Sequence, residues 1–245
     1  MRELHWDGYP NNCDLGGLPT EMSSTGMTRF GRLARGPRRE RLTTSGWAAA
    51  REWGVRSIVD LRTAAEVGSR NGDPTVGEAD LRDISVVLAP TENQEDPEFQ
   101  RLCFPILDSP EYWQHNWVLQ PELVAAALRA IAGAVPGILF HCSAGRDRTG
   151  MISALLLGNA GVDPAAVFED YAESVLAMAG ANVHSPTHDR QSAWSREEAL
   201  EWLESKRDIV EDAARRAPEI LEQLGLTAGE RARLRTLLVS EDATS

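Results

Sequence analysis

Five residues separate Cys142 from Arg148, and this spacing is the clearest chemical signal in the sequence. A short apolar run ends at Cys142, small residues follow, and the apolar segment 151–157 is typical of a helix. We therefore place Cys142 where a buried strand ends and a helix begins. Such a loop can wrap one tetrahedral oxyanion, because its backbone N–H groups and the positive helix end face the anion. Arg148 can fork onto two of the anion's oxygens, and the same positive field favours a nucleophilic thiolate at Cys142.

The neighbouring residues complete the predicted anion site. We expect His141 to orient the loop through hydrogen bonds and Thr149 to donate its hydroxyl group to the sulfur of Cys142. The loop needs no metal, and we expect no cofactor. His184 and His188 stand four residues apart, but without a helix this spacing does not indicate a metal site. The predicted anion-binding residues are Ser143, Ala144, Gly145, Arg146, Asp147 and Arg148.

Residues 141–150 read His-Cys-Ser-Ala-Gly-Arg-Asp-Arg-Thr-Gly. This segment resembles the signature loop of cysteine-dependent protein phosphatases, His-Cys-x-x-Gly-x-x-Arg followed by Thr. In its longer form it is similar to the loop of the atypical bacterial tyrosine phosphatase family. Some members of that family act on phosphotyrosine, phosphoserine or phosphothreonine, and phosphoinositides.

Three further stretches fit the same family, so the resemblance extends over about 11–179. Residues 11–17 are similar to its entry motif Asn-x-Arg-Asp-Leu-Gly-Gly, except that Cys13 stands where arginine is usual. Residues 31–36 match Gly-x-Leu-x-Arg-Ser with Gly36 in place of serine, and residues 60–66 match Asp-Leu-Arg-Ser/Thr-x-x-Glu. The alternative for each stretch is a structural turn or ion network. The resemblance implies supporting residues around the loop, which are Asp14, Arg35, Asp60 and Arg62.

The resemblance implies a two-step hydrolysis in which Cys142 forms a phosphocysteine that water then cleaves. It also supports Asp147 as the general acid. Arg146 and Arg148 flank Asp147, however, and would favour its ionised form. Asp60, at the end of a predicted strand, and Asp108 are the alternatives, and we rank Asp147 first.

Three functions are compatible with this sequence. The first is a protein-tyrosine phosphatase, or one of dual specificity that also acts on phosphoserine and phosphothreonine, that releases inorganic phosphate from a phosphorylated protein. The second is a phosphatase of phosphoinositides or small phosphomonoesters, because Arg146 stands where related loops with phosphoinositide activity often carry lysine. The third is a non-catalytic phosphate-binding module, which would be expected to have lost Cys142 or Arg148.

Composition narrows the function further. The 245 residues carry a formal net charge of −12, which argues against nucleic-acid binding and against broad docking onto anionic membranes. No apolar stretch is long enough to span a bilayer, and the first residues lack a signal-peptide core. We expect a cytoplasmic protein. Export without a signal peptide is the alternative. Three cysteines make neither a disulfide framework nor a metal-binding spacing.

Strand and helix patterns alternate along the chain and predict an α/β fold, with a mainly parallel central sheet, helices on both faces and additional C-terminal helices. We expect a single phosphatase domain over 1–245, with 180–245 as a helical cap or lid. Capping boxes at Ser195 and Thr227 open C-terminal helices, the first reaching about residue 217. We expect 89–99, which is acidic and polar, to be mobile and 240–245 to be a frayed tail. The predicted strands are 31–36, 55–62, 81–88 and 137–141, and the main predicted helices are 46–53, 121–134, 149–160 and 165–179.

Overall fold

The computed structural model describes residues 2–181 and 185–240. His184 and nearly all of the predicted frayed tail lie outside these residues. None of the helices within them is both long and apolar enough to cross a membrane.

A five-stranded sheet in the order β1-β2-β5-β3-β4 forms the centre of the molecule. β2, β5, β3 and β4 are parallel, and the two-residue β1 pairs antiparallel with β2. The prediction of a mainly parallel α/β fold is confirmed. The strands are β1 (Cys13–Asp14), β2 (Leu33–Gly36), β3 (Ser57–Asp60), β4 (Ser85–Leu88) and β5 (Ile138–His141).

The central strand β5 is buried on both faces. Its residues alternate between two hydrophobic cores, with Phe140 in the larger one and Leu139 in the smaller one, as the two-residue period of a strand requires. His141 lies beside Gly36 of β2 and Asp60 of β3. The carboxyl ends of three parallel strands therefore meet at one edge of the sheet, where α/β folds commonly build ligand sites.

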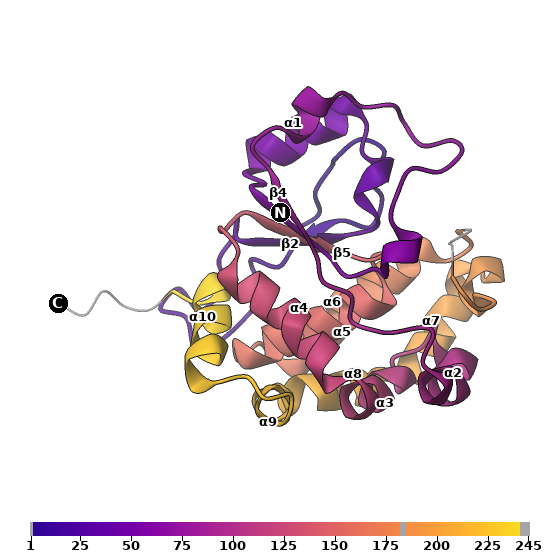
Figure 1. The fold of residues 1–245 in the computed structure, drawn as a ribbon. Coiled ribbons are helices and arrows are strands. Elements are labelled where there is room, and N and C mark those ends of the chain that lie inside the picture. Colours follow the sequence, from indigo (N-terminus) through magenta and orange to yellow (C-terminus); the bar gives the residue numbers. More distant parts are fainter. Residues whose placement is uncertain (1, 182–184, 241–245) are drawn as a thin grey trace.

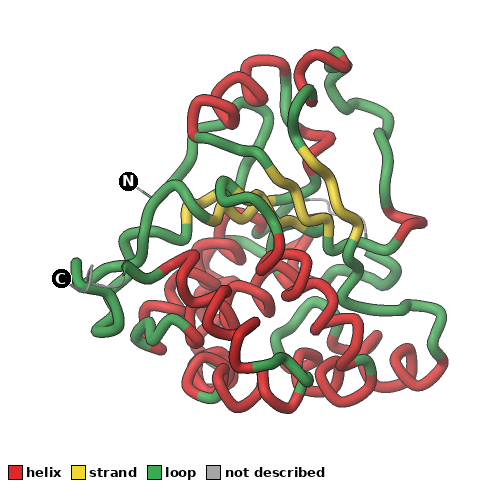
Figure 2. Tube along the Cα trace, turned by 60° about the vertical axis from the view of Figure 1, so that its left-hand side comes forward, coloured by secondary structure: helices red, strands yellow, loops and turns green. Residues whose placement is uncertain are grey.

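The two faces of the sheet carry unequal helical layers (Figures 1 and 2). α1 (Thr44–Trp53) covers one face, where Trp47 packs with Trp6 of the N-terminal segment. The other face is covered by α4 (Pro121–Gly133), α5 (Asp147–Asn159) and α6 (Pro164–Met178). A further helical layer packs beneath these three and is formed by α3 (Glu111–Leu119), α8 (Arg207–Arg215) and α9 (Ala217–Gln223).

Most of the expected helix boundaries are confirmed. α1 ends at Gly54, which has a left-handed φ of 110°. α3 and α4 are separate helices, and the second begins at Pro121 as expected. Both capping boxes are present, one before α7 (Arg196–Glu204) and one before α10 (Ala228–Leu238).

One expectation about these elements is wrong. The segment from Ser195 to residue 217 is not one helix, because the chain turns at Ser205 and Lys206 between α7 and α8. This turn lets α7 pack on α6 while α8 packs on both α5 and α6. The polar segment 89–99 includes the start of the helix α2 (Pro97–Cys103), which Asp96 caps through the N–H groups of Glu98 and Phe99.

Candidate active site

The loop 142–146 connects the buried end of β5 to the start of α5. The first N–H groups of α5 have no acceptor within the helix, so they are available to an anion in front of the loop. Gly145 has a φ of +73°, and a Cβ atom there would lie 2.5 Å from the carbonyl carbon of Gly36. Only glycine fits this position without displacing the β2 backbone.

Neighbouring segments hold the loop in place. The side chain of Asn11 donates hydrogen bonds to the carbonyl oxygens of Ala144, at 3.0 Å, and Gly145, at 3.2 Å. The N–H of Arg38 donates to the carbonyl oxygen of Ser143 at 3.1 Å. With its carbonyl oxygens bound on the outside, the loop can present its N–H groups inward.

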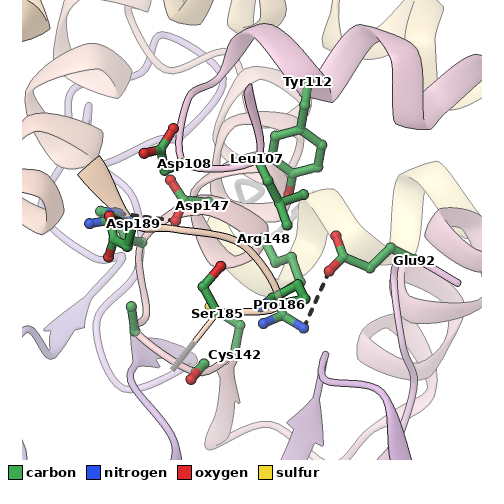
Figure 3. A pocket seen from close by; sticks show the side chains of 13 residues that line it. Glu92, Leu107, Asp108, Tyr112, Cys142, Asp147, Arg148, Ser185, Pro186 and Asp189 are labelled. Atoms are coloured by element: carbon green, nitrogen blue, oxygen red, sulfur yellow. Dashed lines mark hydrogen bonds and ion pairs between the residues drawn. The ribbon is translucent and has the colours of Figure 1, made fainter. Parts of the chain in front are cut away.

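A cavity of about 40 Å³ lies in front of this loop (Figure 3). Cys142, with 2% of its surface exposed, is at its base. Five of the six predicted anion-binding residues line the cavity, and Gly145 is the exception. The remaining walls come from three other parts of the chain and consist of Glu92, Leu107, Asp108, Tyr112, Ser185, Pro186 and Asp189.

Arg148 is held by two carboxyl groups that are distant in sequence. Its Nη1 and Nη2 atoms contact Oε2 and Oε1 of Glu66 at 2.6 and 2.7 Å, and Nη1 lies 3.5 Å from Oε1 of Glu92. Burial opposes ionisation of Glu66, but the hydrogen bonds from Arg148 lower the pKa of that carboxyl group to about 2. The guanidinium is therefore fixed in orientation by an ionised partner.

Asp147 does not sit between two arginines. Its Oδ2 atom is 3.0 Å from Nε of Arg146, whereas Arg148 turns to Glu66. Burial raises the pKa of Asp147 to about 6, Arg146 opposes this rise, and Asp189 adds to it. Arg146 favours the ionised form, as expected from its position, but burial outweighs it, so about half of the Asp147 carboxyl groups are protonated at pH 6 and most are ionised at pH 7.

The pKa values of the two alternative acids, Asp60 and Asp108, are lowered instead of raised. Burial opposes ionisation of Asp60, but hydrogen bonds from Arg62 lower its pKa overall, and it also pairs with Arg39 at 2.9 Å. Asp108 does line the cavity, but it accepts hydrogen bonds from Arg190, which lower its pKa overall against the effect of burial. Both carboxyl groups are held in the form that cannot donate a proton.

Of the two residues expected to support the loop from either side, His141 makes a contact of the expected kind and Thr149 does not. Burial lowers the pKa of His141 to about 4, so the ring is neutral, and its Nδ1 lies 3.1 Å from the carbonyl oxygen of Cys142. This contact matches an orienting role. The predicted hydrogen bond from Thr149 to the sulfur of Cys142 is not formed, because the buried Oγ1 of Thr149 has no hydrogen-bond partner among the described residues.

The other predicted supporting residues lie outside the cavity. Arg35 is fully buried, bonds to Asp170 through Nε at 3.0 Å, and donates to Oδ1 of Asn11 at 3.2 Å, so it reaches the loop through Asn11. Asp14 accepts hydrogen bonds from the N–H groups of Gly16 and Gly31 and from Trp53, and so it stabilises the entry turn. The guanidinium of Arg62 donates hydrogen bonds to the carboxyl groups of Asp60 and Glu40.

Comparison with known protein families shows whether the motif resemblance reflects membership of a family. The sequence profile described as "Tyrosine phosphatase family" matches residues 4–240. The chain belongs to the tyrosine phosphatase family. This membership confirms the resemblance seen in residues 141–150.

Two curated relatives in this family are similar over part of the chain. A tyrosine-protein phosphatase of Nostoc commune is 32% identical over 140 residues, which is 57% of this chain and 47% of that protein. The triple specificity protein phosphatase PtpB of Mycobacterium tuberculosis is 29% identical over 173 residues, which is 60% of this chain and 62% of that protein. The chain thus spans about half to three fifths of these relatives. The crystal structure of P. aeruginosa TpbA is 16% identical, covering 75% of this chain and 86% of that one, with a TM-score of 0.31.

Two acidic residues of the site in this family member were missed by sequence reasoning. Glu92 follows β4 in a polar segment, and nothing local distinguishes it from Glu95 or Asp96. Asp189 accepts a hydrogen bond from Nη2 of Arg146 at 3.1 Å, although the two are far apart in sequence. A strand end is the only signal that could have suggested Glu92.

The remaining cysteines differ from Cys142 in their surroundings. Burial raises the pKa of Cys13 to about 11 and that of Cys103 to about 12, so both thiols are protonated at neutral pH. Both lie outside the cavity. In the part of the chain that the structure describes, no group of three or more histidine, cysteine or acidic side chains is placed to hold a metal ion.

Proposed function

We propose that this protein is a cysteine-dependent tyrosine phosphatase that hydrolyses phosphate monoesters through a phosphocysteine intermediate. One observation carries the proposal. A single cavity holds the Cys142 thiol, the Arg148 guanidinium in a fixed orientation, and the carboxyl group of Asp147 with its pKa raised to about 6.

In the first step, the thiolate of Cys142 attacks phosphorus as the bond to the leaving oxygen breaks. Protonated Asp147 gives its proton to that oxygen, so a neutral alcohol departs. In the second step, ionised Asp147 takes a proton from water, the water oxygen attacks phosphorus, and the phosphorus–sulfur bond breaks. Inorganic phosphate leaves, and the Cys142 thiolate is restored.

Arg148 can bind the phosphoryl group without releasing Glu66. A guanidinium has five N–H groups, and the two contacts with Glu66 use one hydrogen on each terminal nitrogen. The other hydrogens, with the N–H groups of the loop, can hold the oxygens that gain charge in the transition state. Positioning and charge stabilisation would then supply most of the rate enhancement.

The cavity walls favour an aryl phosphate. Leu107, Tyr112 and Pro186 offer apolar surface beside Cys142, which suits the ring of phosphotyrosine. Ser185, Pro186 and Asp189 form part of the cavity wall, so movement of 185–189 would widen the cavity for a phosphotyrosine side chain. Arg146, considered as a site for a second phosphate, is already paired with Asp147 and Asp189, which gives phosphoinositides less support.

We also infer that the chain works as one phosphatase domain over 1–245, with 180–245 as a helical cap from which Ser185, Pro186 and Asp189 line the cavity. Three free, buried cysteines and the net charge of −12 support a cytoplasmic location and a partner other than nucleic acid. The name of PtpB, a triple specificity phosphatase, makes phosphoserine, phosphothreonine and phosphoinositides the alternative substrates to compare.

Phosphate release from an aryl phosphate in the presence of EDTA tests the proposal. Wild type and Cys13→Ser should release phosphate at similar rates, because Cys13 lies outside the cavity, whereas Cys142→Ser should release none above background. Folded wild type that binds phosphate but releases none would instead support the non-catalytic module. A panel of phosphopeptides and phosphoinositides would then rank the substrates.

A further inference from the structure

Glu92 is a buried carboxyl group on the cavity wall that the mechanism above does not use. Glu92 has 2% of its surface exposed and lines the same cavity as Cys142 (Figure 3). Oε1 accepts a hydrogen bond from Gln94 at 2.7 Å and lies 3.5 Å from Nη1 of Arg148. Oε2 is buried and has no hydrogen-bond partner among the described residues. A buried oxygen without a partner is costly unless something completes its bonding.

The groups around Glu92 come from four other elements. Arg148 on α5 attracts its negative charge, and Glu66 after β3 repels it. Cys103 on α2 and Tyr112 on α3 are also within electrostatic reach. Burial, with a smaller contribution from Glu66, raises the pKa of Glu92 above its ordinary value, although Arg148 and Gln94 lower it.

The cavity holds more acidic than basic side chains before any substrate enters. The walls carry Arg146 and Arg148 against Glu92, Asp108, Asp147 and Asp189. From outside the cavity, Glu66 pairs with Arg148 and Arg190 pairs with Asp108. A dianion bound by Arg148 would lie beside the carboxyl group that shares that arginine. Two negative charges at such a distance repel strongly in a buried site. Taking up one proton would remove the repulsion and turn Glu92 into a hydrogen-bond donor.

We propose that Glu92 is a proton-linked anion-binding residue, whose carboxyl group is protonated when the site is filled and donates its hydrogen from Oε2 to an oxygen of the bound oxyanion. The inference rests on the proposed function, since it assumes that Arg148 and the loop bind phosphoryl groups. It makes binding of a dianion accompany uptake of one proton from solvent. Affinity for a dianion should consequently fall as pH rises above the pKa of Glu92 in the empty site.

Sulfate is the probe for this coupling, because it is tetrahedral and stays a dianion across the useful pH range. We would titrate sulfate into Cys142→Ser protein by calorimetry between pH 5 and 8, in pairs of buffers with different ionisation enthalpies. The buffer dependence counts the protons taken up. Cys142→Ser serves as the background because it removes titration of the nucleophile, and Arg148→Met in that background shows which binding belongs to this site.

The matched variants are Glu92→Gln, which keeps a donor of similar shape but cannot titrate, and Asp147→Asn, which removes the other titrating carboxyl group. Above the pKa of Glu92, the background protein should lose up to about tenfold in affinity per pH unit through this residue. Glu92→Gln should bind sulfate with a flatter pH dependence and lower proton uptake. Asp147→Asn should retain the part that depends on Glu92.

Two results would overturn the inference about Glu92 alone. One is a Glu92→Gln variant that weakens sulfate equally at every pH, as expected if Glu92 merely positions Arg148. The other is the absence of proton uptake at every pH in the Asp147→Asn protein, which decides the question even if Glu92→Gln does not fold. Sulfate that fails to bind the background protein, or that binds Arg148→Met equally well, would overturn both the inference and the proposed phosphate site.

Discussion

The carboxylate of Glu66 accepts a hydrogen bond from each terminal nitrogen of Arg148, with N–O distances of 2.6 and 2.7 Å. Glu66 in turn accepts a hydrogen bond from the N–H of Thr63 at 3.0 Å, which fixes it at the end of a short 3₁₀ turn after β3. Arg148, the proposed phosphate-binding residue on α5, is therefore oriented by the turn that follows β3. This pairing sets the geometry of the site before any anion arrives.

Replacing Glu66 by glutamine should lower kcat/KM about 100-fold, the scale expected when a positioning group is lost. Glutamine keeps the size of the side chain but can accept only one of the two guanidinium bonds, so Arg148 gains freedom to rotate. Steady-state kinetics with an aryl phosphate measure this effect. Glu98→Gln is the matched control, because Glu98 pairs with Arg101 on the exposed surface of α2, and it should leave kcat/KM unchanged. Equal rates in Glu66→Gln and wild type would contradict the positioning role.

Replacing Asp147 by asparagine should lower kcat about 10²- to 10⁴-fold for a poor leaving group such as phenyl phosphate. The loss should be much smaller for p-nitrophenyl phosphate, whose leaving oxygen needs no proton. Because Asp147 must be protonated in the first step and its pKa is raised to about 6, wild-type kcat/KM should fall as pH rises above 6. The part of this fall that Asp147 causes should disappear in the variant, and only the part linked to Glu92 should remain. A pH profile that is unchanged in Asp147→Asn would assign the acid to another group.

Adding a methyl group at Gly145 should distort the loop. Gly145→Ala places a Cβ within 2.5 Å of the Gly36 backbone, whereas Gly26, with a similar φ of +71°, has nothing within 4 Å of such an atom. Both substitutions introduce a side chain at a positive φ, at a cost of about 1–2 kcal/mol. The close contact should make Gly145→Ala less stable than Gly26→Ala and should abolish activity only in the former. Chemical denaturation and an aryl phosphate assay test both statements.

Loosening the segment that covers the cavity should help bulky substrates. Arg190 anchors this segment to Asp108 through its backbone N–H and its guanidinium, with N–O distances of 2.9 Å. Arg190→Ala should therefore raise kcat/KM for a phosphotyrosine peptide more than for a small aryl phosphate. Arg196→Ala, a change on the nearby helix α7, is the control. A variant that slows both substrates equally would show that the contact holds the site together instead of closing it.

How much of this site could be predicted depends on sequence distance. The loop could be recognised because Cys142, Gly145 and Arg148 stand at fixed offsets between an apolar strand and an apolar helix. The raised pKa of Asp147 could not be predicted in this way, since its neighbours in sequence are both arginines. Successive residues of a helix point about 100° apart, so Arg148 faces Glu66 while Asp147 faces Arg146.

Contacts between distant segments account for the rest. Glu66 stands within a motif that the sequence shows, but its partner Arg148 lies 82 residues away. Glu92 and Asp189 sit in polar segments with no periodic pattern, and their partners Arg148 and Arg146 are distant in sequence. The fold itself was predictable, because strands buried on both faces and capped amphipathic helices leave local signals. The break between α7 and α8 at Lys206 left no such signal in the sequence.

The most direct test of the account is to trap the intermediate. Wild type would be mixed with a radiolabelled phosphotyrosine peptide, quenched within milliseconds in acid, and digested, and the labelled peptide would be identified by mass spectrometry. The account predicts label on the peptide that contains Cys142 and none in Cys142→Ser. With radiolabelled p-nitrophenyl phosphate as substrate, Asp147→Asn should carry more label than wild type, because it lacks the base that activates water. Turnover with no label on Cys142 at any quench time, or label on another residue, would contradict the cysteine mechanism.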